Sequence, residues 1–400
     1  MVHQNEEKIR QSIIQVGKWV EDHNYRGYEY SDGLSSPLKA LTFGNLFLER
    51  CLLQLVRLSP VNIRPLVGVK PLDSTKGRGY MAWGYLTMFR LTKDPTYEEK
   101  TRGCLQWLDE NKAKNYEGHS WGNHFEFSSR SGRTPKLEPI IVWTSLIGQA
   151  FLDGYELLGE ERYLEVAKSI CRWILALPRE RTDHGTCLSY VAYMQSTVHN
   201  SNMLGAAMLA RTARITGAKE LAETAAEAME YSCTRQLSDG AWYYGEDPKY
   251  HWVDNFHTGY NLDSLKCYLE NTNDMRFDKN LRRGFEYYMK EFFESDGTPR
   301  YYNNKKFPVD IQCASQAITT LANFADVYPE ALDISLKVAN WTIDNMQDKK
   351  GYFYYRVMPW GKMKVPLLHW GQATMYRGLT LLYSKLKDPN SGKAKTEAVS

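Results

Sequence analysis

Helical stretches occupy most of this chain, and their hydrophobic and polar positions show that they come in pairs. The first stretch of each pair is apolar on most faces, whereas the second is apolar on one face and charged on the other. Residues 142–159 are followed in this way by 161–177, and residues 202–217 by 219–237. A helix that is apolar all round is packed on all sides, so the first members predict an inner layer and the second members an outer layer.

The outer stretches carry a repeated signal, an aromatic residue followed eight to twelve residues later by a glycine. From the second pair onward the aromatics recur at intervals of 66, 58, 56 and 54 residues. A period of this length indicates a repeat architecture, in which each unit buries its apolar face against the next. The six pairs are Trp19/Gly27, Trp107/Gly118, Trp173/Gly185, Tyr231/Gly240, Tyr287/Gly297 and Trp341/Gly351.

The predicted fold is an all-α (α/α)6 toroid that spans residues 1–386 as one domain. The first outer stretch, 6–23, has no partner before it and the last inner stretch, 372–386, has none after it, so their pairing closes a ring of six helical hairpins. The region 37–75 is additional to the repeat and contains one more helix and a proline-rich segment. Residues 387–400 form a polar C-terminal tail.

The connections from outer to inner stretches are long, and all of them fall at one end of the predicted ring. Long loops on a rigid scaffold usually carry function. These loops are rich in aromatic residues, which suit sugars because the apolar faces of a sugar stack on aromatic rings. The alternative is that the aromatic segments are short β-hairpins that only cover the helices. The expected sugar-stacking residues are Trp242, Tyr244, Trp252, Tyr302, Tyr355 and Trp370, and Glu29 and Tyr30 are expected at the same end.

Two aspartates stand at equivalent places in neighbouring units. Asp254 and Asp310 are 56 residues apart, and each precedes an inner stretch. Packed helices lie about 8–10 Å apart, a separation similar to that of the two carboxylates in inverting glycosidases. The sequence therefore predicts Asp254 and Asp310 as catalytic residues, with His257 assisting. Helix capping alone is the competing interpretation.

Further polar residues of the loop end are predicted to bind substrate. His199, His369 and Gln372 begin other inner stretches, and Arg300 and Arg356 lie in the loops. Helix N-termini and arginines both favour anions, so a carboxylated or phosphate-linked sugar is expected. The alternative for each histidine is a purely structural role.

Composition narrows the possible partners and location. The net charge of +3 is too small to indicate nucleic-acid binding, and no apolar run is long enough for a transmembrane helix. The seven cysteines contain no CxxC pair and the histidines no zinc-binding spacing, so neither a metal nor another cofactor is expected. The charged N-terminus does not resemble a secretory signal, and we expect a cytoplasmic protein.

Several strings resemble known families. Gln236 to Trp242 resembles the QW-type signature of terpenoid cyclases, although their acidic DxDD and DDxxD motifs are absent. The chain as a whole is similar to a family of prokaryotic proteins found with polysaccharide and glycan biosynthesis genes. That resemblance implies an (α/α)6 toroid, as in six-hairpin glycosidases, and a glycan context. The strings that carry it are residues 30–37, 59–69, 159–167, 253–260, 296–302, 351–356 and 369–379.

The leading functional hypothesis is a glycoside hydrolase-like enzyme that acts on an acidic or lipid-linked oligosaccharide in glycan biosynthesis. One alternative is an epimerase or lyase of uronic-acid residues. Another is a non-catalytic glycan-binding subunit, peripherally associated with a polysaccharide-assembly complex.

Overall fold

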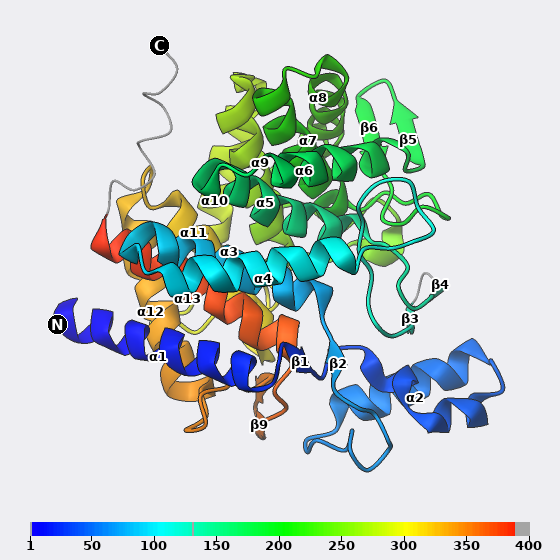
Figure 1. The fold of residues 1–400 in the computed structure, drawn as a ribbon, viewed down its shortest axis with the longest axis vertical. Coiled ribbons are helices and arrows are strands. Elements are labelled where there is room, and N and C mark those ends of the chain that lie inside the picture. Colours follow the sequence, from blue (N-terminus) through cyan, green and yellow to red (C-terminus); the bar gives the residue numbers. More distant parts are fainter. Residues whose placement is uncertain (1, 130–131, 389–400) are drawn as a thin grey trace.

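The computed structural model describes residues 2–129 and 132–388, so residues 389–400 of the predicted tail lie outside the described part. Six helices form an inner ring in which each packs against the next, and α13 packs against α3 to close it (Figure 1). The inner helices are α3 (Thr75–Thr92), α5 (Ile141–Leu158), α7 (His199–Thr216), α9 (Asn255–Thr272), α11 (Ile311–Phe324) and α13 (Thr374–Lys387).

A second helix packs outside each inner helix. The first helix of the chain, α1, packs on the last, α13, as the sequence predicts. The described residues thus form six hairpins, and the predicted (α/α)6 toroid is confirmed. The outer helices are α1 (Val2–Asp22), α4 (Pro95–Glu110), α6 (Glu161–Leu175), α8 (Lys219–Thr234), α10 (Asp278–Glu291) and α12 (Pro329–Met346).

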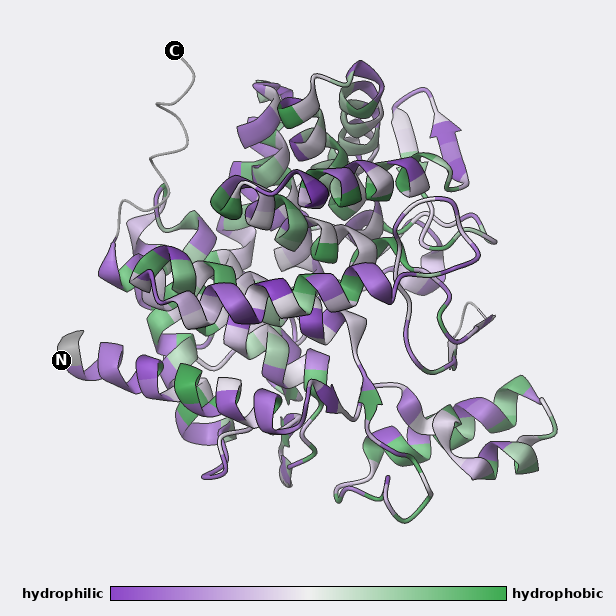
Figure 2. Ribbon diagram, in the orientation of Figure 1, coloured by the Kyte–Doolittle hydropathy of each residue, from purple (hydrophilic) through white to green (hydrophobic). Residues whose placement is uncertain are grey.

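Burial follows the apolar pattern of the two layers. Every residue of α5 from Ile141 to Leu152 is buried, whereas α1 and α4 carry hydrophilic residues along their length (Figure 2). Gly159 and Gly217 end α5 and α7 in the left-handed conformation, which glycine adopts without steric cost.

Five glycines in the outer-to-inner loops touch the next outer helix. All five have φ between +90° and +98°. A Cβ atom at any of them would lie 2.2–2.7 Å from a backbone carbonyl oxygen of that helix, so only glycine fits. Each carbonyl belongs to the residue four positions before the repeated aromatic of the next unit. The repeated aromatic and the glycine of the preceding unit therefore mark one contact between neighbouring outer helices. The glycine–carbonyl pairs are Gly118–Ser169, Gly185–Glu227, Gly240–Arg283, Gly297–Lys337 and Gly351–Gln15.

Short antiparallel strands lie in the same loops, as predicted. The strand β1 pairs with β2, β3 with β4, β5 with β6, and β7, β8 and β9 form a three-stranded sheet. The strands are β1 (Arg26–Gly27), β2 (Leu72–Asp73), β3 (Phe127–Ser129), β4 (Gly132–Thr134), β5 (Arg179–Thr182), β6 (Gly185–Leu188), β7 (Val309–Asp310), β8 (Arg356–Met358) and β9 (Gly361–Met363).

The region between α1 and α3 projects from the toroid (Figure 1). It contains the 3-10 helices η1 (Asp32–Ser35) and η2 (Pro37–Thr42) and the helix α2 (Leu46–Leu58). The helix α2 packs on η1 and β3. No helix in the described residues is both long and apolar enough to cross a bilayer.

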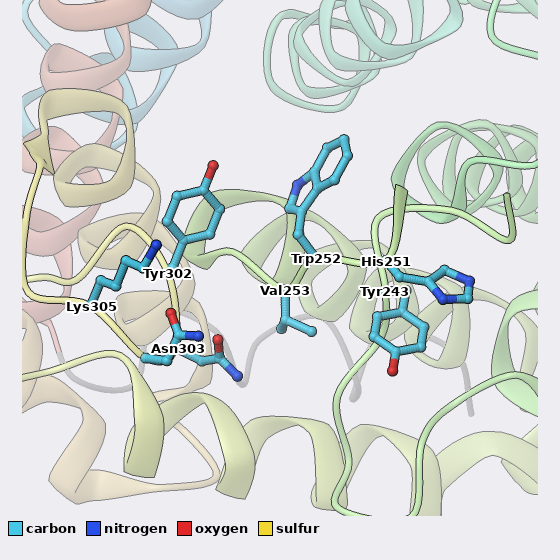
Figure 3. Close-up of a pocket in the computed structure, with 8 residues that line it drawn as sticks. Tyr243, His251, Trp252, Val253, Tyr302, Asn303 and Lys305 are labelled. Carbon is cyan, nitrogen blue, oxygen red and sulfur yellow. The ribbon is translucent and has the colours of Figure 1, made fainter. Parts of the chain in front are cut away.

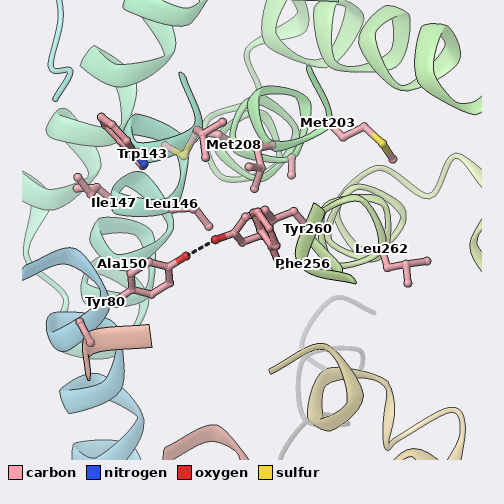
Figure 4. Close-up of a cluster of buried hydrophobic side chains, with 14 of the residues drawn as sticks. Tyr80, Trp143, Leu146, Ile147, Ala150, Met203, Met208, Phe256, Tyr260 and Leu262 are labelled. Atoms are coloured by element: carbon pink, nitrogen blue, oxygen red, sulfur yellow. Dashed lines mark hydrogen bonds between the residues drawn. The ribbon is translucent and has the colours of Figure 1, made fainter. Parts of the chain in front are cut away.

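Aromatic side chains fill the middle of the inner ring. The hydroxyls of Tyr80 on α3 and Tyr260 on α9 lie 3.0 Å apart, which joins opposite sides of the ring (Figure 4). The side-chain amide of Gln312 on α11 donates to the Tyr260 hydroxyl at 2.8 Å. These bonds hold three inner helices at fixed relative positions.

Replacement of Gly240 by alanine tests the glycine contact. The added Cβ would lie 2.4 Å from the Arg283 carbonyl oxygen at φ +98°, so we expect a loss of roughly 2–4 kcal/mol in the free energy of unfolding. Gly159→Ala is the matched control, because Gly159 has φ +69° but open space around it, and it should lose only about 1 kcal/mol. Chemical denaturation measures both. Equal losses would mean that backbone conformation, and not the helix contact, selects glycine.

Candidate functional site

The six inner helices begin at the end of the toroid that carries the long loops. Lys76 is in the first turn of α3, Trp143 in that of α5 and His257 in that of α9. His369 lies in η5 (Leu368–Ala373), a π-helical segment that leads into α13. Such segments are rare and often occur at functional sites.

Lys76 is a buried amine that forms no ion pair with the described residues. Its side chain is only 6% exposed, and its Nζ atom lies 5.6 Å from the ring centre of Tyr80, 6.0 Å from Trp143 and 5.8 Å from Tyr260. Burial lowers the pKa of Lys76 to about 7, and the attraction of Glu29 opposes this only in part. Near neutral pH the amine is therefore able both to donate and to accept a proton.

His369 is held by Glu29, a residue from the loop after α1. The Glu29 carboxylate contacts Nδ1 of His369 and also accepts its backbone N–H at 3.2 Å. Both side chains are buried. Burial has the largest influence on the pKa of His369 and lowers it, although Glu29 acts in the opposite direction.

A second carboxylate–histidine pair stands at the start of α9. Asp254 caps the helix by accepting the His257 backbone N–H at 3.0 Å, and its other oxygen lies 2.7 Å from Nδ1 of His257. The indole N–H of Trp252 donates to the same oxygen at 2.9 Å. Asp254 is buried, whereas the His257 side chain is 20% exposed. This arrangement fixes the imidazole and directs Nε2 away from the aspartate.

The two histidines and Lys76 share their aromatic neighbours. The ring of Tyr260 lies 6.5 Å from that of His257 and 5.8 Å from Nζ of Lys76. The ring of Trp143 lies 6.3 Å from that of His369 and 6.0 Å from the same Nζ. Each histidine therefore shares an aromatic neighbour with Lys76, and we call Lys76, His257 and His369 with Asp254 and Glu29 the basic cluster.

Asp310 is bound in a different way. Its carboxylate pairs with the Arg356 guanidinium, accepts the Trp370 indole N–H at 2.9 Å, and caps α11 by accepting the Gln312 backbone N–H at 2.9 Å. The side chain is fully buried. The capping interpretation thus describes the observed contacts of Asp310, and the catalytic role predicted for it stays a prediction.

Aromatic rings stand around the basic cluster, as the sequence predicts for the loop end. Tyr244 stacks on Trp252 at 4.7 Å, and Tyr30 stacks on Trp370 at 4.5 Å. Tyr355 is buried, and its hydroxyl has no hydrogen-bond partner among the described residues.

A pocket of about 470 Å³ lies beside these rings. Trp252 and Tyr302 point to one side of the chain there, and Tyr243 and Val253 point to the other (Figure 3). None of the five members of the basic cluster lines the pocket. The pocket is therefore separate from the basic cluster.

Four residues predicted to bind substrate have other partners. The ring nitrogens of His199 face Ser232 of α8 at 3.2 Å and Glu246 at 2.8 Å. The other three are also bonded to protein groups. These are Trp242, whose N–H donates to the Ser232 carbonyl; Gln372, which bonds the Phe353 backbone; and Arg300, which pairs with Glu294.

The sequence prediction did not include Lys76, Trp143 or Tyr260. The signal available in the sequence was Lys76 at the start of an apolar inner stretch. Asp73 is the one acidic residue within four positions of it. Within the described residues no group of histidine, cysteine, aspartate and glutamate is arranged to hold a metal ion.

No protein-family model matches the chain, and no curated protein matches it in sequence. The chain is similar in fold to many solved structures, among them the three that follow. A cellobiose 2-epimerase from Bacillus thermoamylovorans is 12% identical, with a TM-score of 0.60 over 78% of this chain and 88% of that one. A D-mannose isomerase is 11% identical, with a TM-score of 0.60 over 78% and 87%.

The third structure is an α-1,6-mannanase from Salegentibacter, 13% identical, with a TM-score of 0.55 over 79% of this chain and 90% of that one. It is an inactive variant with two consecutive aspartates replaced by asparagine, in complex with α-1,6-mannotriose. At these identities the likeness establishes the fold alone, an (α/α)6 toroid.

Replacement of Lys76 by methionine tests its buried charge. An unfolded lysine has a pKa of about 10.4, so below about pH 7 both states are protonated and the full cost of burying the cation is present. Between about pH 7 and 10 the unfolded state binds more protons, and stability rises with pH. We expect Lys76→Met to be more stable than the parent by roughly 2–4 kcal/mol near pH 6, with an advantage that shrinks towards about pH 10.

Urea denaturation at the two pH values measures this difference. The control is Lys349→Met, because Lys349 is exposed and its removal should change stability little at either pH. An advantage that is independent of pH would show that Lys76 does not titrate in this range.

Proposed function

We propose that this protein is a sugar epimerase or isomerase, which moves a proton at a carbon next to a carbonyl group. The observation that carries the proposal is the basic cluster. Its two histidines, one at the start of α9 and one in η5, are each held by a buried carboxylate, and each shares an aromatic neighbour with Lys76. The likeness in fold to a cellobiose 2-epimerase and a D-mannose isomerase supports the same choice.

The chemistry follows from these positions. Nε2 of His257 removes the proton at C2 of an open-chain sugar, and the C–H electron pair forms an enediolate with negative charge on the C1 oxygen. Asp254 stabilises the resulting imidazolium through Nδ1. The protonated Lys76 stabilises the enediolate oxygen. His369 then donates a proton, either to the opposite face of C2, which gives the epimer, or to C1 while the proton of the C2 hydroxyl moves to the C1 oxygen, which gives the ketose.

Hydrolysis by Asp254 and Asp310 is the second function to test, because a mannanase shares the fold. For hydrolysis, both aspartates of this chain would need to release their present hydrogen bonds. Asp254 binds His257 and Trp252, and Asp310 binds Arg356 and Trp370. This chain also contains no two consecutive aspartates. These observations favour proton transfer over hydrolysis.

An acidic or lipid-linked oligosaccharide, a role in glycan biosynthesis, a cytoplasmic location and a peripheral place in a glycan-assembly complex remain parts of the proposal. Arg300 and Arg356, which were predicted to bind a carboxylated sugar, are paired with Glu294 and Asp310. An acidic group of the substrate would therefore have to be recognised by Lys76.

Proton NMR in D2O with mannose, glucose, cellobiose, α-1,6-mannotriose and a uronic-acid oligosaccharide tests the function. Loss of the C2 proton signal with the appearance of a second sugar supports the proposal. Shorter mannose oligomers would establish hydrolysis instead, and vinyl protons would establish a lyase. Line broadening with no new signal would favour a glycan-binding subunit.

The histidine variants test the assigned roles. On the sugar converted by the parent protein, His257→Asn and His369→Asn should each lower kcat by about 10²–10⁴-fold, the usual contribution of a general acid or base. One of the two variants should still exchange the C2 proton of one epimer with solvent, because the histidine that it retains still reaches one face of C2. The control is His119→Gln, which removes another histidine paired with an aspartate, Asp109, outside the basic cluster. Losses no larger than those of the control would refute the assignment.

A further inference from the structure

The projecting region carries a concentration of exposed apolar side chains. Ten of the 17 exposed large hydrophobic residues in the described part of the chain lie between positions 38 and 66. Phe43 is 88% exposed, Leu66 85% and Phe47 70%. We call this set the apolar surface. It consists of Leu38, Leu41, Phe43, Leu46, Phe47, Leu48, Leu55, Leu58, Val61 and Leu66.

The helix α2 has the reverse of the usual orientation for a surface helix. Its inner side holds Leu53 and Val56 and also its one carboxylate, Glu49, which is fully buried and bound to Arg133 and Ser128. Its outer side carries the exposed side chains of Leu46, Phe47, Leu48, Leu55 and Leu58 beside Arg50 and Gln54, and Figure 2 colours the hydrophobic residues of the helix green. Water does not favour such an orientation, whereas an apolar environment outside the protein does.

Cationic side chains outnumber carboxylates around the apolar surface, although Lys39 and Arg64 are paired with Glu126 and Asp32. Between residues 37 and 70 the sequence holds five cationic side chains and one carboxylate, a net charge of +4. The carboxylate, Glu49, is buried, whereas Arg50 and Lys70 are exposed and make no ion pair with the described residues. Exposed apolar side chains next to unpaired cations match the surface of an anionic bilayer, with lipid tails below and negative headgroups around.

We propose that the apolar surface inserts into the interface of a membrane that contains anionic lipids. A second copy of this chain is a poorer match, because two such surfaces would bring net positive charges together. The absence of a membrane-crossing helix in the described residues is compatible with a protein that lies on the bilayer.

The position of the surface connects it to the basic cluster. Arg57 of α2 donates to the Tyr30 hydroxyl, and Tyr30 stacks on Trp370, the residue after His369. Binding to a bilayer would therefore bring the loop end of the toroid close to sugars carried by lipids. The membrane proposal itself does not depend on the reaction at that end.

Vesicle binding of the full chain tests the proposal. The probes are vesicles of phosphatidylcholine alone and of phosphatidylcholine mixed with phosphatidylglycerol. We expect flotation with the anionic vesicles, weaker flotation with the neutral ones, and a decrease at high salt because the headgroup attraction is screened. The triple variant Phe43→Ser/Phe47→Ser/Leu66→Ser should bind at least about tenfold more weakly, and so should Arg50→Glu/Lys70→Glu.

The control changes exposed apolar residues elsewhere, Met275→Ser/Val327→Ser, and should bind as the parent does. Cys51 on α2 provides a local readout, because it is exposed while the other six cysteines are buried or partly buried. A polarity-sensitive fluorophore on Cys51 should shift to the blue when anionic vesicles are added.

Three results would overturn the proposal. They are no binding to either vesicle, equal binding of the parent and the triple variant, and a stable dimer in sedimentation velocity that the triple variant abolishes. The last result would assign the apolar surface to self-association. Because no sugar is involved, failure here leaves the outcome at the basic cluster unaffected.

Discussion

The contact between a loop glycine and the backbone of the next outer helix determines how the toroid is built. Five times along the chain a glycine near φ +90° fills a space that a Cβ atom would share with a carbonyl oxygen. Each contact sets how closely one outer helix approaches its neighbour, and the series runs from α6 through α8, α10 and α12 to α1. Because the same loops then lead into the inner helices, the contact also fixes where each inner helix begins.

This placement of the helix starts makes the basic cluster possible. Lys76, His257 and His369 come from three inner helical segments, and the Tyr80–Tyr260 hydrogen bond ties two of these segments across the ring. A buried, unpaired lysine destabilises the folded chain, so a rigid fold is needed to hold it there. The closed ring supplies that rigidity, since a helix in it cannot shift without disturbing both neighbours.

Features that depend on local spacing were predicted from the sequence, whereas contacts between residues far apart in the chain were not. The aromatic–glycine period predicted the six hairpins and their closure, and the three-residue spacing of Asp254 and His257 placed that pair correctly at one helix start. The partner of His369 is Glu29, 340 residues away, and no local pattern marks such a pair. The orientation of His199 could not be predicted from local spacing either, because its ring faces Ser232 on an outer helix.

The buried carboxylates at the loop end are of two kinds, because some are paired with an arginine and others with a histidine. Asp32 and Asp310 are paired with Arg64 and Arg356, and a guanidinium keeps its proton at any pH that the fold tolerates. Asp254 and Glu29 are paired with His257 and His369, and an imidazole is a side chain that both donates and accepts protons. The arginine pairs hold the loops in place. The histidine pairs are the ones that we propose for proton transfer, and for this reason we favour movement of a proton between carbons over hydrolysis by two carboxylates.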